Sequence, residues 1–274
     1  MKSILLSALA LVSVAAAPAV AADFPVKAAM PAGPIYDWNG AYIGVNGDIQ
    51  YSGPNSLTGY SGGPGTAAFF AAGGLPTSLA TSAWGYSGGA QIGYNWQVSR
   101  IWLVGLEADI QGGGYKGNSS IGSNPAVGAL TTAVEQHSDW FGTARGRAGL
   151  LIAPNMLFYA TGGFAFGQAA ASQSTIGTGS SLASCPAALP CAAASTDKTR
   201  YGWAAGVGYE IMMPNTNWTV KAEYLYMDLG TVSLAATTPA FTPPVTFTSS
   251  NQFRESMLRV GVNYRFGGPV VAKY

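Results

Sequence analysis

Alternating apolar and polar residues recur along this chain in segments of about ten residues, the length of a membrane-crossing β-strand. Eight such segments lie between Trp38 and Phe266. The gaps between them alternate in length: long gaps fall at about 52–86, 113–136, 168–199 and 230–254, and short gaps at about 97–101, 152–155 and 211–217. Barrels that span the bacterial outer membrane have this rhythm of long outer loops and tight periplasmic turns.

Within each segment, one face suits lipid and the other suits an interior. In residues 40–51, Ile43 and Val45 share one face while Asn46 and Asp48 share the other, because neighbouring side chains of a strand point to opposite sides. A membrane-crossing sheet must pair every backbone group without water, so it must close on itself. The pattern therefore predicts an all-β fold, an eight-stranded antiparallel up-and-down transmembrane β-barrel. Residues 156–167 are apolar on both faces, so their register stays open.

The competing fold is a soluble β-sandwich or lipocalin-like barrel, in which the apolar faces point into the core. Charged residues make up only 9% of the chain, against about 25% in a typical soluble domain. A barrel surrounded by lipid needs few charges, so the composition favours the membrane fold. Once Lys2 is removed with the leader described below, acidic and basic residues are equal in number. No basic patch indicates a nucleic-acid partner.

The first residues have the pattern of a secretory signal peptide. Lys2 precedes an apolar stretch, Ile4–Ala17, and an A-x-A cleavage site follows at Ala19–Ala21. The sequence therefore predicts four parts. These are a signal peptide at 1–21, a periplasmic N-terminal linker at 22–37, an outer-membrane β-barrel at 38–266 and a C-terminal tail at 267–274. An even number of strands places both chain ends in the periplasm.

Charged side chains gather on the interior faces and form a predicted charge cluster. Antiparallel neighbours bring Glu107 and Asp109 close to Arg145 and Arg147. A second group contains Lys221, Glu223, Arg259 and Arg265, with Asp48 within reach when the last strand closes on the first. In one interpretation these ion pairs fill and cross-link the lumen; in the other they line a small gated pore. An eight-stranded interior is only wide enough for its own side chains, which favours the first.

The two cysteines, Cys185 and Cys191, lie in the third long gap. An exported protein meets an oxidising compartment, so we expect a local disulfide between them; two unpaired thiols are the alternative.

Catalytic patterns are missing. The chain has one histidine, His137, no nucleophile motif and no phosphate-binding loop. The glycines at 112–114 fall in an expected loop, without the strand-to-helix setting that phosphate binding requires. Glu107 and Asp109 suggest acid–base chemistry, but their predicted arginine neighbours favour ion pairing. We therefore expect no catalytic residue, no cofactor and no metal site.

Three stretches resemble a known family. Residues 36–44 (YDWNGAYIG) resemble the first strand of the porin-like outer-membrane surface-antigen family, small eight-stranded barrels of Gram-negative bacteria. Residues 140–149 (WFGTARGRAG) are similar to its fourth-strand motif, and residues 258–266 (LRVGVNYRF) resemble its closing strand. The resemblance implies an outer-membrane barrel with a structural or antigenic role and no enzyme activity. It also implies a C-terminal aromatic assembly signal, for which Phe266 and Tyr274 are the candidates.

These observations predict a non-enzymatic outer-membrane protein that contributes to envelope structure and cell-surface contact. The alternatives are a small diffusion channel, and an adhesin or ligand-binding protein that acts through its loops. The expected partners are outer-membrane lipid and lipopolysaccharide, and the barrel-assembly machinery; a homo-oligomer is left open.

Overall fold

The computed structural model describes residues 36–53, 56–61, 82–122, 130–177, 190–238 and 244–267. All of them belong to one compact unit, Pro34–Tyr274. No helix in these ranges is long and apolar enough to cross a membrane.

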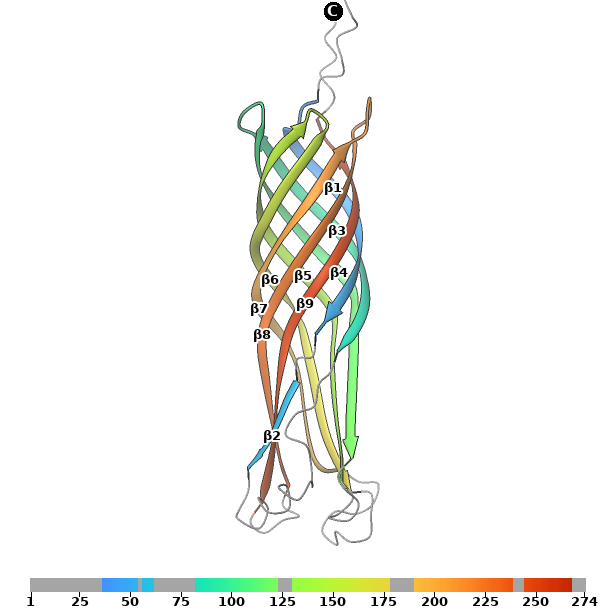
Figure 1. Ribbon diagram of the computed structural model, residues 1–274, viewed down its shortest axis with the longest axis vertical. Helices are drawn as coiled ribbons and strands as arrows, with labels where there is room; N and C mark the ends of the chain where they lie inside the picture. Colours follow the sequence, from blue (N-terminus) through green and yellow to red (C-terminus); the bar gives the residue numbers. More distant parts are fainter. Residues whose placement is uncertain are drawn as a thin grey trace, which may run out of the picture. The chain divides into compact units, whose positions relative to one another are not determined.

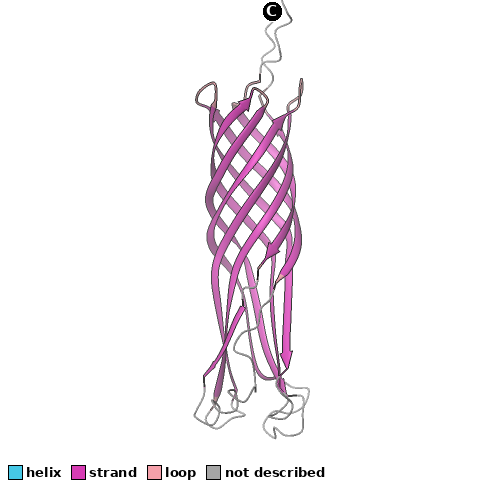
Figure 2. Cartoon of the chain, viewed as in Figure 1, coloured by secondary structure: helices cyan, strands magenta, loops and turns pink. Residues whose placement is uncertain are grey.

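The described residues form one antiparallel sheet that closes on itself (Figures 1 and 2). Its strands are β1 (Gly40–Ser52), β2 (Ser56–Ser61), β3 (Ala83–Gln97), β4 (Trp102–Gly122), β5 (Leu130–Ala153), β6 (Met156–Gly177), β7 (Pro190–Met212), β8 (Trp218–Thr238) and β9 (Val245–Arg265). The ring runs β1–β3–β4–β5–β6–β7–β8–β9 and closes where β9 pairs with β1. The predicted eight-stranded antiparallel barrel is confirmed. The short β2 is an addition that pairs with β9 in the described structure.

The two faces of the strands follow the predicted alternation. Val45 of β1 is 64% exposed on the outside, whereas Asp48 is 5% exposed and faces the lumen. The register that the sequence left open, in β6, turns Leu157 and Tyr159 inward and leaves Phe164 on the outside.

The strands are longer than the sequence pattern predicted, because β-structure continues into each long gap. β5 has 24 residues and begins at Leu130, and β6 has 22 and continues to Gly177. The glycines at 112–114, expected in a loop, lie inside β4. They accompany a break in register between β4 and β5, where Gly113 has a positive φ of 91°. That backbone conformation favours glycine, so these glycines shape a bulge.

Beyond the closed ring the sheet divides into two. The pairing of β7 with β8 ends at Trp203 and Asp228. From there β7 continues along β6 to Pro190, and β8 continues along β9 to Thr238. One sheet is therefore β4–β5–β6–β7 and the other β8–β9–β2 (lower half of Figure 1). We call the ring in which all eight strands pair the closed barrel, and the divided part the extension. The extension consists of β2 and residues 115–122, 130–138, 168–177, 190–202, 229–238 and 245–253.

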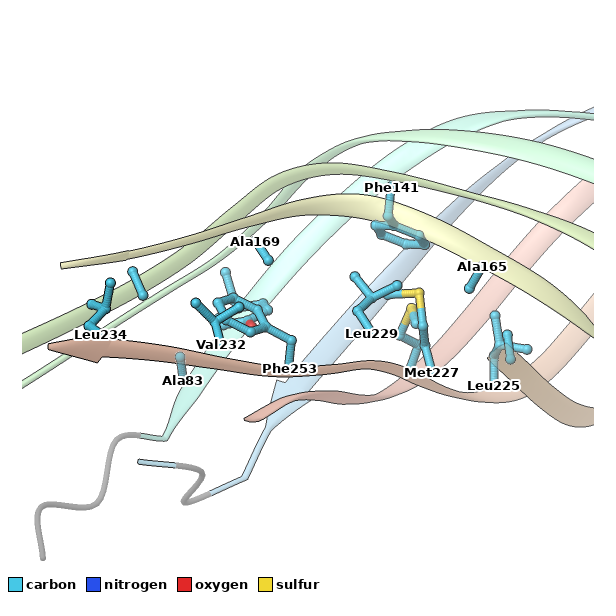
Figure 3. Close-up of a cluster of buried hydrophobic side chains, with 14 residues drawn as sticks. Ala83, Phe141, Ala165, Ala169, Leu225, Met227, Leu229, Val232, Leu234 and Phe253 are labelled. Atoms are coloured by element: carbon cyan, nitrogen blue, oxygen red, sulfur yellow. The ribbon is translucent and has the colours of Figure 1, made fainter. Parts of the chain in front are cut away.

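An apolar cluster connects the two sheets of the extension and continues into the closed barrel. In Figure 3 the side chains of Leu225, Met227 and Leu229 from β8 point across the lumen toward β5 and β6. The cluster comprises Ala83, Tyr115, Phe141, Ala165, Ala169, Ala171, Ala204, Leu225, Met227, Leu229, Val232, Leu234, Phe253 and Met257. The extension thus has an apolar interior along β8, although it lies beyond the lipid-facing ring, while β5 and β6 also bury polar side chains such as Gln136 and Gln173.

Candidate functional site

A network of charged side chains crosses the lumen of the closed barrel, and Arg145 of β5 is its hub. The Arg145 Nη2 atom lies 2.8 Å from Glu107 Oε1 and 3.1 Å from Asp109 Oδ2, both on β4. Its Nη1 atom donates to Glu223 of β8, across the lumen. The Nε atom donates to Thr143 Oγ1 at 2.9 Å. One guanidinium thus binds three carboxylates, a use of arginine's planar, multiply donating group.

Glu107 is the matching acidic centre. Lys221 Nζ donates to both Glu107 carboxylate oxygens, at 2.8 and 2.9 Å, and lies 3.5 Å from Glu223 Oε2. The hydroxyl of Tyr42 donates to Glu107 Oε2 at 2.8 Å. This carboxylate therefore links β1, β4, β5 and β8 through the centre of the lumen.

Arg147 connects a further strand, β7. Its Nη1 atom lies 2.9 Å from Glu210 Oε2, and its Nε and Nη2 atoms donate to Asn95 Oδ1. The guanidinium also lies over the rings of Tyr42 and Tyr159, 4.7 and 5.4 Å from their centroids. Glu210 was absent from the predicted cluster, although alternation along β7 turns it inward.

Arg259 of β9 joins this network to the first strand. Its Nη2 atom lies 3.2 Å from Asp48 Oδ2, and its Nη1 atom lies 3.4 Å from Asp109 Oδ1. Glu223 lies opposite Arg259 in the register, and Arg259 joins the two predicted groups, while Lys221 and Glu223 form their cross-lumen ion pairs with β4 and β5. A lumen this narrow lets long side chains reach the opposite wall, which sequence neighbours cannot reveal.

Arg265, assigned to the predicted cluster, is buried but forms no ion pair within the described ranges. It donates to the backbone carbonyl of Asn39 at 3.3 Å, and its guanidinium lies 5.8 Å from the ring centroid of Trp38. Trp38 is fully buried, and its Nε1 donates to Pro154 O at 3.0 Å. It packs with Leu103, Leu157, Tyr159 and Met212. Trp38, the first residue of the predicted barrel domain, therefore fills the mouth of the barrel at the end with the tight turns.

The network is shielded from solvent, with side-chain exposures of 0–4% across its ion pairs. Ion pairs at this depth hold their partners firmly, because breaking one leaves a buried charge without compensation. The described part of the chain buries six carboxylates against five basic groups. The acids are Asp48, Glu107, Asp109, Glu210, Glu223 and Glu255, and the bases are Arg145, Arg147, Lys221, Arg259 and Arg265.

Glu255 is the carboxylate without a counterion. It is 1% exposed, and neither of its carboxylate oxygens has a hydrogen-bond partner among the described residues. Beyond the closed barrel, burial and then the negative charge of Glu255 raise the pKa of Tyr115 well above its ordinary value. Glu255 was absent from the predicted cluster, although it precedes Arg259 by an even number of residues on β9 and so shares its face.

The remaining predicted residues lie outside this network. Cys191 is half-buried on β7, while Cys185 falls outside the described residues, so their pairing stays a prediction. Phe266 follows β9 and is 59% exposed; Tyr274 also falls outside the described residues. His137 Nε2 lies 4.0 Å from Asp139 Oδ2 on an exposed part of β5. The described ranges contain no group of three or more His, Cys, Asp or Glu side chains that could hold a metal ion.

Comparison with known proteins agrees with this architecture. The family model described as outer membrane protein beta-barrel domain matches residues 7–266. The 31 kDa outer-membrane immunogenic protein of Brucella melitensis is 34% identical over 280 residues, covering 97% of this chain and all of the relative. The 22 kDa outer membrane protein of Rhizobium leguminosarum is 27% identical, covering 67% of each chain.

Among solved structures, OprG from Pseudomonas aeruginosa matches with a TM-score of 0.43 and 11% identity, covering 85% of this chain and 99% of that one. The match of the family model and the Brucella relative confirm the resemblance to outer-membrane surface antigens. The chain belongs to the outer-membrane β-barrel family and is an outer-membrane protein.

Proposed function

We propose that this protein is a sealed, non-enzymatic barrel that contributes to envelope structure and presents its extension at the cell surface. The observation that carries the proposal is the buried charged network, because Arg145 and Glu107 together join walls on opposite sides of the lumen. Trp38 fills one mouth, and the apolar cluster fills the lumen beyond the network. Three consecutive layers of side chains thus obstruct passage.

The proposed orientation follows from the lengths of the connections. The tight turns at 98–101, 154–155 and 213–217 lie at the same end of the barrel as the start of β1 and the end of β9. Tight turns of outer-membrane barrels face the periplasm. Both chain termini would then be periplasmic and the extension would be extracellular. In this arrangement outer-membrane lipid and lipopolysaccharide surround the apolar face, and the assembly machinery reads the closing strand through Phe266 or Tyr274.

The absence of enzyme activity is part of the proposal. Glu107 and Asp109 are the two carboxylates whose spacing in the sequence suggested acid–base chemistry. In the structure Glu107 forms an ion pair with Lys221, and Asp109 forms one with Arg145. Such carboxylates are held as counterions and have no free position for a substrate.

A small channel is the second candidate, and one observation favours it. Several lumen atoms have no hydrogen-bond partner in the described structure, among them Gln111 Oε1, Glu255 Oε1 and Arg259 Nη1. Buried polar atoms without protein partners are commonly satisfied by water. Water at these atoms would give the lumen the solvent that a channel needs.

Single-channel recording in planar bilayers distinguishes the two candidates. The refolded protein without its signal peptide should be silent, whereas the double variant Glu107→Ala/Arg145→Ala should give discrete conductance steps. The matched control Asp228→Ala/Arg254→Ala removes an ion pair of 2.9 Å outside the network and should stay silent. Discrete steps from the unsubstituted protein, with folding verified by circular dichroism, would show a channel instead.

A further inference from the structure

Four strand edges in the extension, those of β2, β4, β7 and β8, have no partner strand among the described residues, and the edges of β7 and β8 separate where the closed barrel ends. Residues 190–202 of β7 pair only with β6, and residues 229–238 of β8 pair only with β9. Where the closed barrel begins, at Trp203 and Asp228, the same two strands pair with each other. An unpaired edge presents a row of backbone donors and acceptors to any extended chain that approaches it.

A side-chain contact shows which backbone groups of β8 face this gap. Arg200 Nη2 of β7 donates to the carbonyl of Thr231 on β8 at 3.1 Å. The carbonyl of Thr231 therefore points toward β7. In a strand the N–H and C=O of one residue point to the same edge, and the direction alternates between residues. Ser233, Ala235 and Thr237 thus direct their backbone groups into the gap, while the residues between them pair with β9.

The gap carries unpaired positive charge. Lys198 and Arg200 of β7 form no ion pair in the described part of the chain, and Arg200 Nε is buried without a hydrogen-bond partner. The nearby acids are already engaged: Asp197 accepts from Gln168 at 3.0 and 2.9 Å, and Asp228 pairs with Arg254. Residues 229–238 of β8 carry no charge at all.

The inner side of the gap is apolar along β8, whereas on β7 Lys198 and Arg200 share the inward face with Ala194. Val232 and Leu234 of β8 are buried in the apolar cluster, where the half-buried Ala194 of β7 packs against it. A strand placed between β7 and β8 would therefore point every second side chain inward, toward the apolar cluster and these two basic residues, and the others at solvent.

We propose that the extension binds an extended acidic peptide segment of a partner protein between β7 and β8, as an added β-strand. Backbone groups of Ser233, Ala235 and Thr237 supply hydrogen bonds, the apolar cluster receives alternate side chains, and Lys198 and Arg200 bind carboxylates. This binding proposal names a partner for the proposed surface role. It rests on the proposed orientation, in which the extension lies outside the cell. Its test is a binding measurement, so it can fail while the barrel remains silent in bilayers.

The test uses a labelled synthetic peptide of about ten residues that alternates valine with threonine and carries two glutamates, the length of the free β8 edge. Fluorescence anisotropy would follow its binding to the full mature protein refolded in lipid vesicles. A control peptide with two lysines in place of the glutamates tests the role of charge. A second control peptide, with alternate backbone amides N-methylated, tests the role of backbone hydrogen bonds. We expect saturable binding of the acidic peptide and at least about tenfold weaker binding of the other two.

Two variants with matched controls locate the site. Ala235→Pro removes a backbone donor from the free edge without removing one from the β9 ladder, and should abolish binding, while Ala235→Ser should not. Lys198→Glu should weaken binding at least about tenfold, while Lys116→Glu, an equal charge change on β4, should leave it unchanged. Absence of saturable binding to the parent protein, equal binding of acidic and basic peptides, or unchanged binding to both test variants would overturn the proposal.

Discussion

The closed barrel and the extension share the continuous strands β4 to β9 but differ in what fills their interiors and covers their outer faces. In the closed barrel the lumen holds ion pairs around Arg145 while the outside is apolar. In the extension the inside holds Val232, Leu234 and Phe253, and the outward residues of β8 are threonine, serine and alanine. The surroundings explain the difference, since lipid covers an apolar outside in one region and water covers a polar outside in the other.

This difference determines how each region stays closed. The membrane allows no unpaired backbone, so all eight strands must form a ring there. Outside the membrane water can satisfy a strand edge, so β7 and β8 can separate beyond Trp203 and Asp228 in the extension. Bulges in β4, β5 and β8 lie near this transition. At the β8 bulge Gly230 has a positive φ of 83°, and its N–H donates to Asp228 Oδ1.

The largest expected effect comes from removing the hub of the network. Arg145→Ala leaves three buried carboxylates without their shared partner, and it should lower the free energy of unfolding by about 3–5 kcal/mol. Arg200→Ala, the same change in the extension, should lower it by less than about 1 kcal/mol. Urea unfolding in lipid vesicles measures both. Equal losses would mean that the network does not hold the closed barrel together.

The second prediction tests the boundary with lipid on a single strand. Val260 of β9 is 54% exposed, midway between aromatic residues at the two ends of the closed barrel. Val260→Arg should lower the free energy of unfolding by about 2–4 kcal/mol, because it places a charge near the centre of the bilayer. Thr248→Arg, on the exposed side of the same strand in the extension, should change stability by less than about 0.5 kcal/mol. Equal insertion yields for both variants would contradict the assigned boundary.

The smallest effect concerns the unpaired carboxylate between the two regions. Glu255→Gln removes a buried acid that has no counterion in the described ranges, so the free energy of unfolding should stay the same or rise by up to about 1 kcal/mol. Glu223→Gln makes the same chemical change within the network and should lower stability by about 2 kcal/mol, since Arg145 and Lys221 lose a charged partner. Both follow from urea midpoints measured at neutral pH. If Glu255→Gln lowered the free energy of unfolding more than Glu223→Gln does, Glu255 would have a partner outside the described residues.

Much of the closed barrel could be predicted from alternation alone. The inward positions of Glu107, Arg145 and Arg259 follow from a period of two, which lipid on one side and a narrow lumen on the other enforce. The neighbouring pair Glu107 and Arg145 also followed, because consecutive strands of an up-and-down barrel are adjacent. Pairing across the lumen did not follow, because it depends on which side chains reach the same depth from opposite walls.

The sequence by itself determined the family, the strand order, the lipid face and the sign of each interior charge. These features repeat locally, and each is enforced residue by residue by the bilayer. Only the tertiary structure decided that Lys221 pairs with Glu107, that Glu255 has no counterion among the described residues, that Trp38 closes one mouth and that the extension divides at Trp203 and Asp228. Those outcomes depend on barrel radius, strand stagger and the length of side chains, which are properties of the closed sheet and of no single segment.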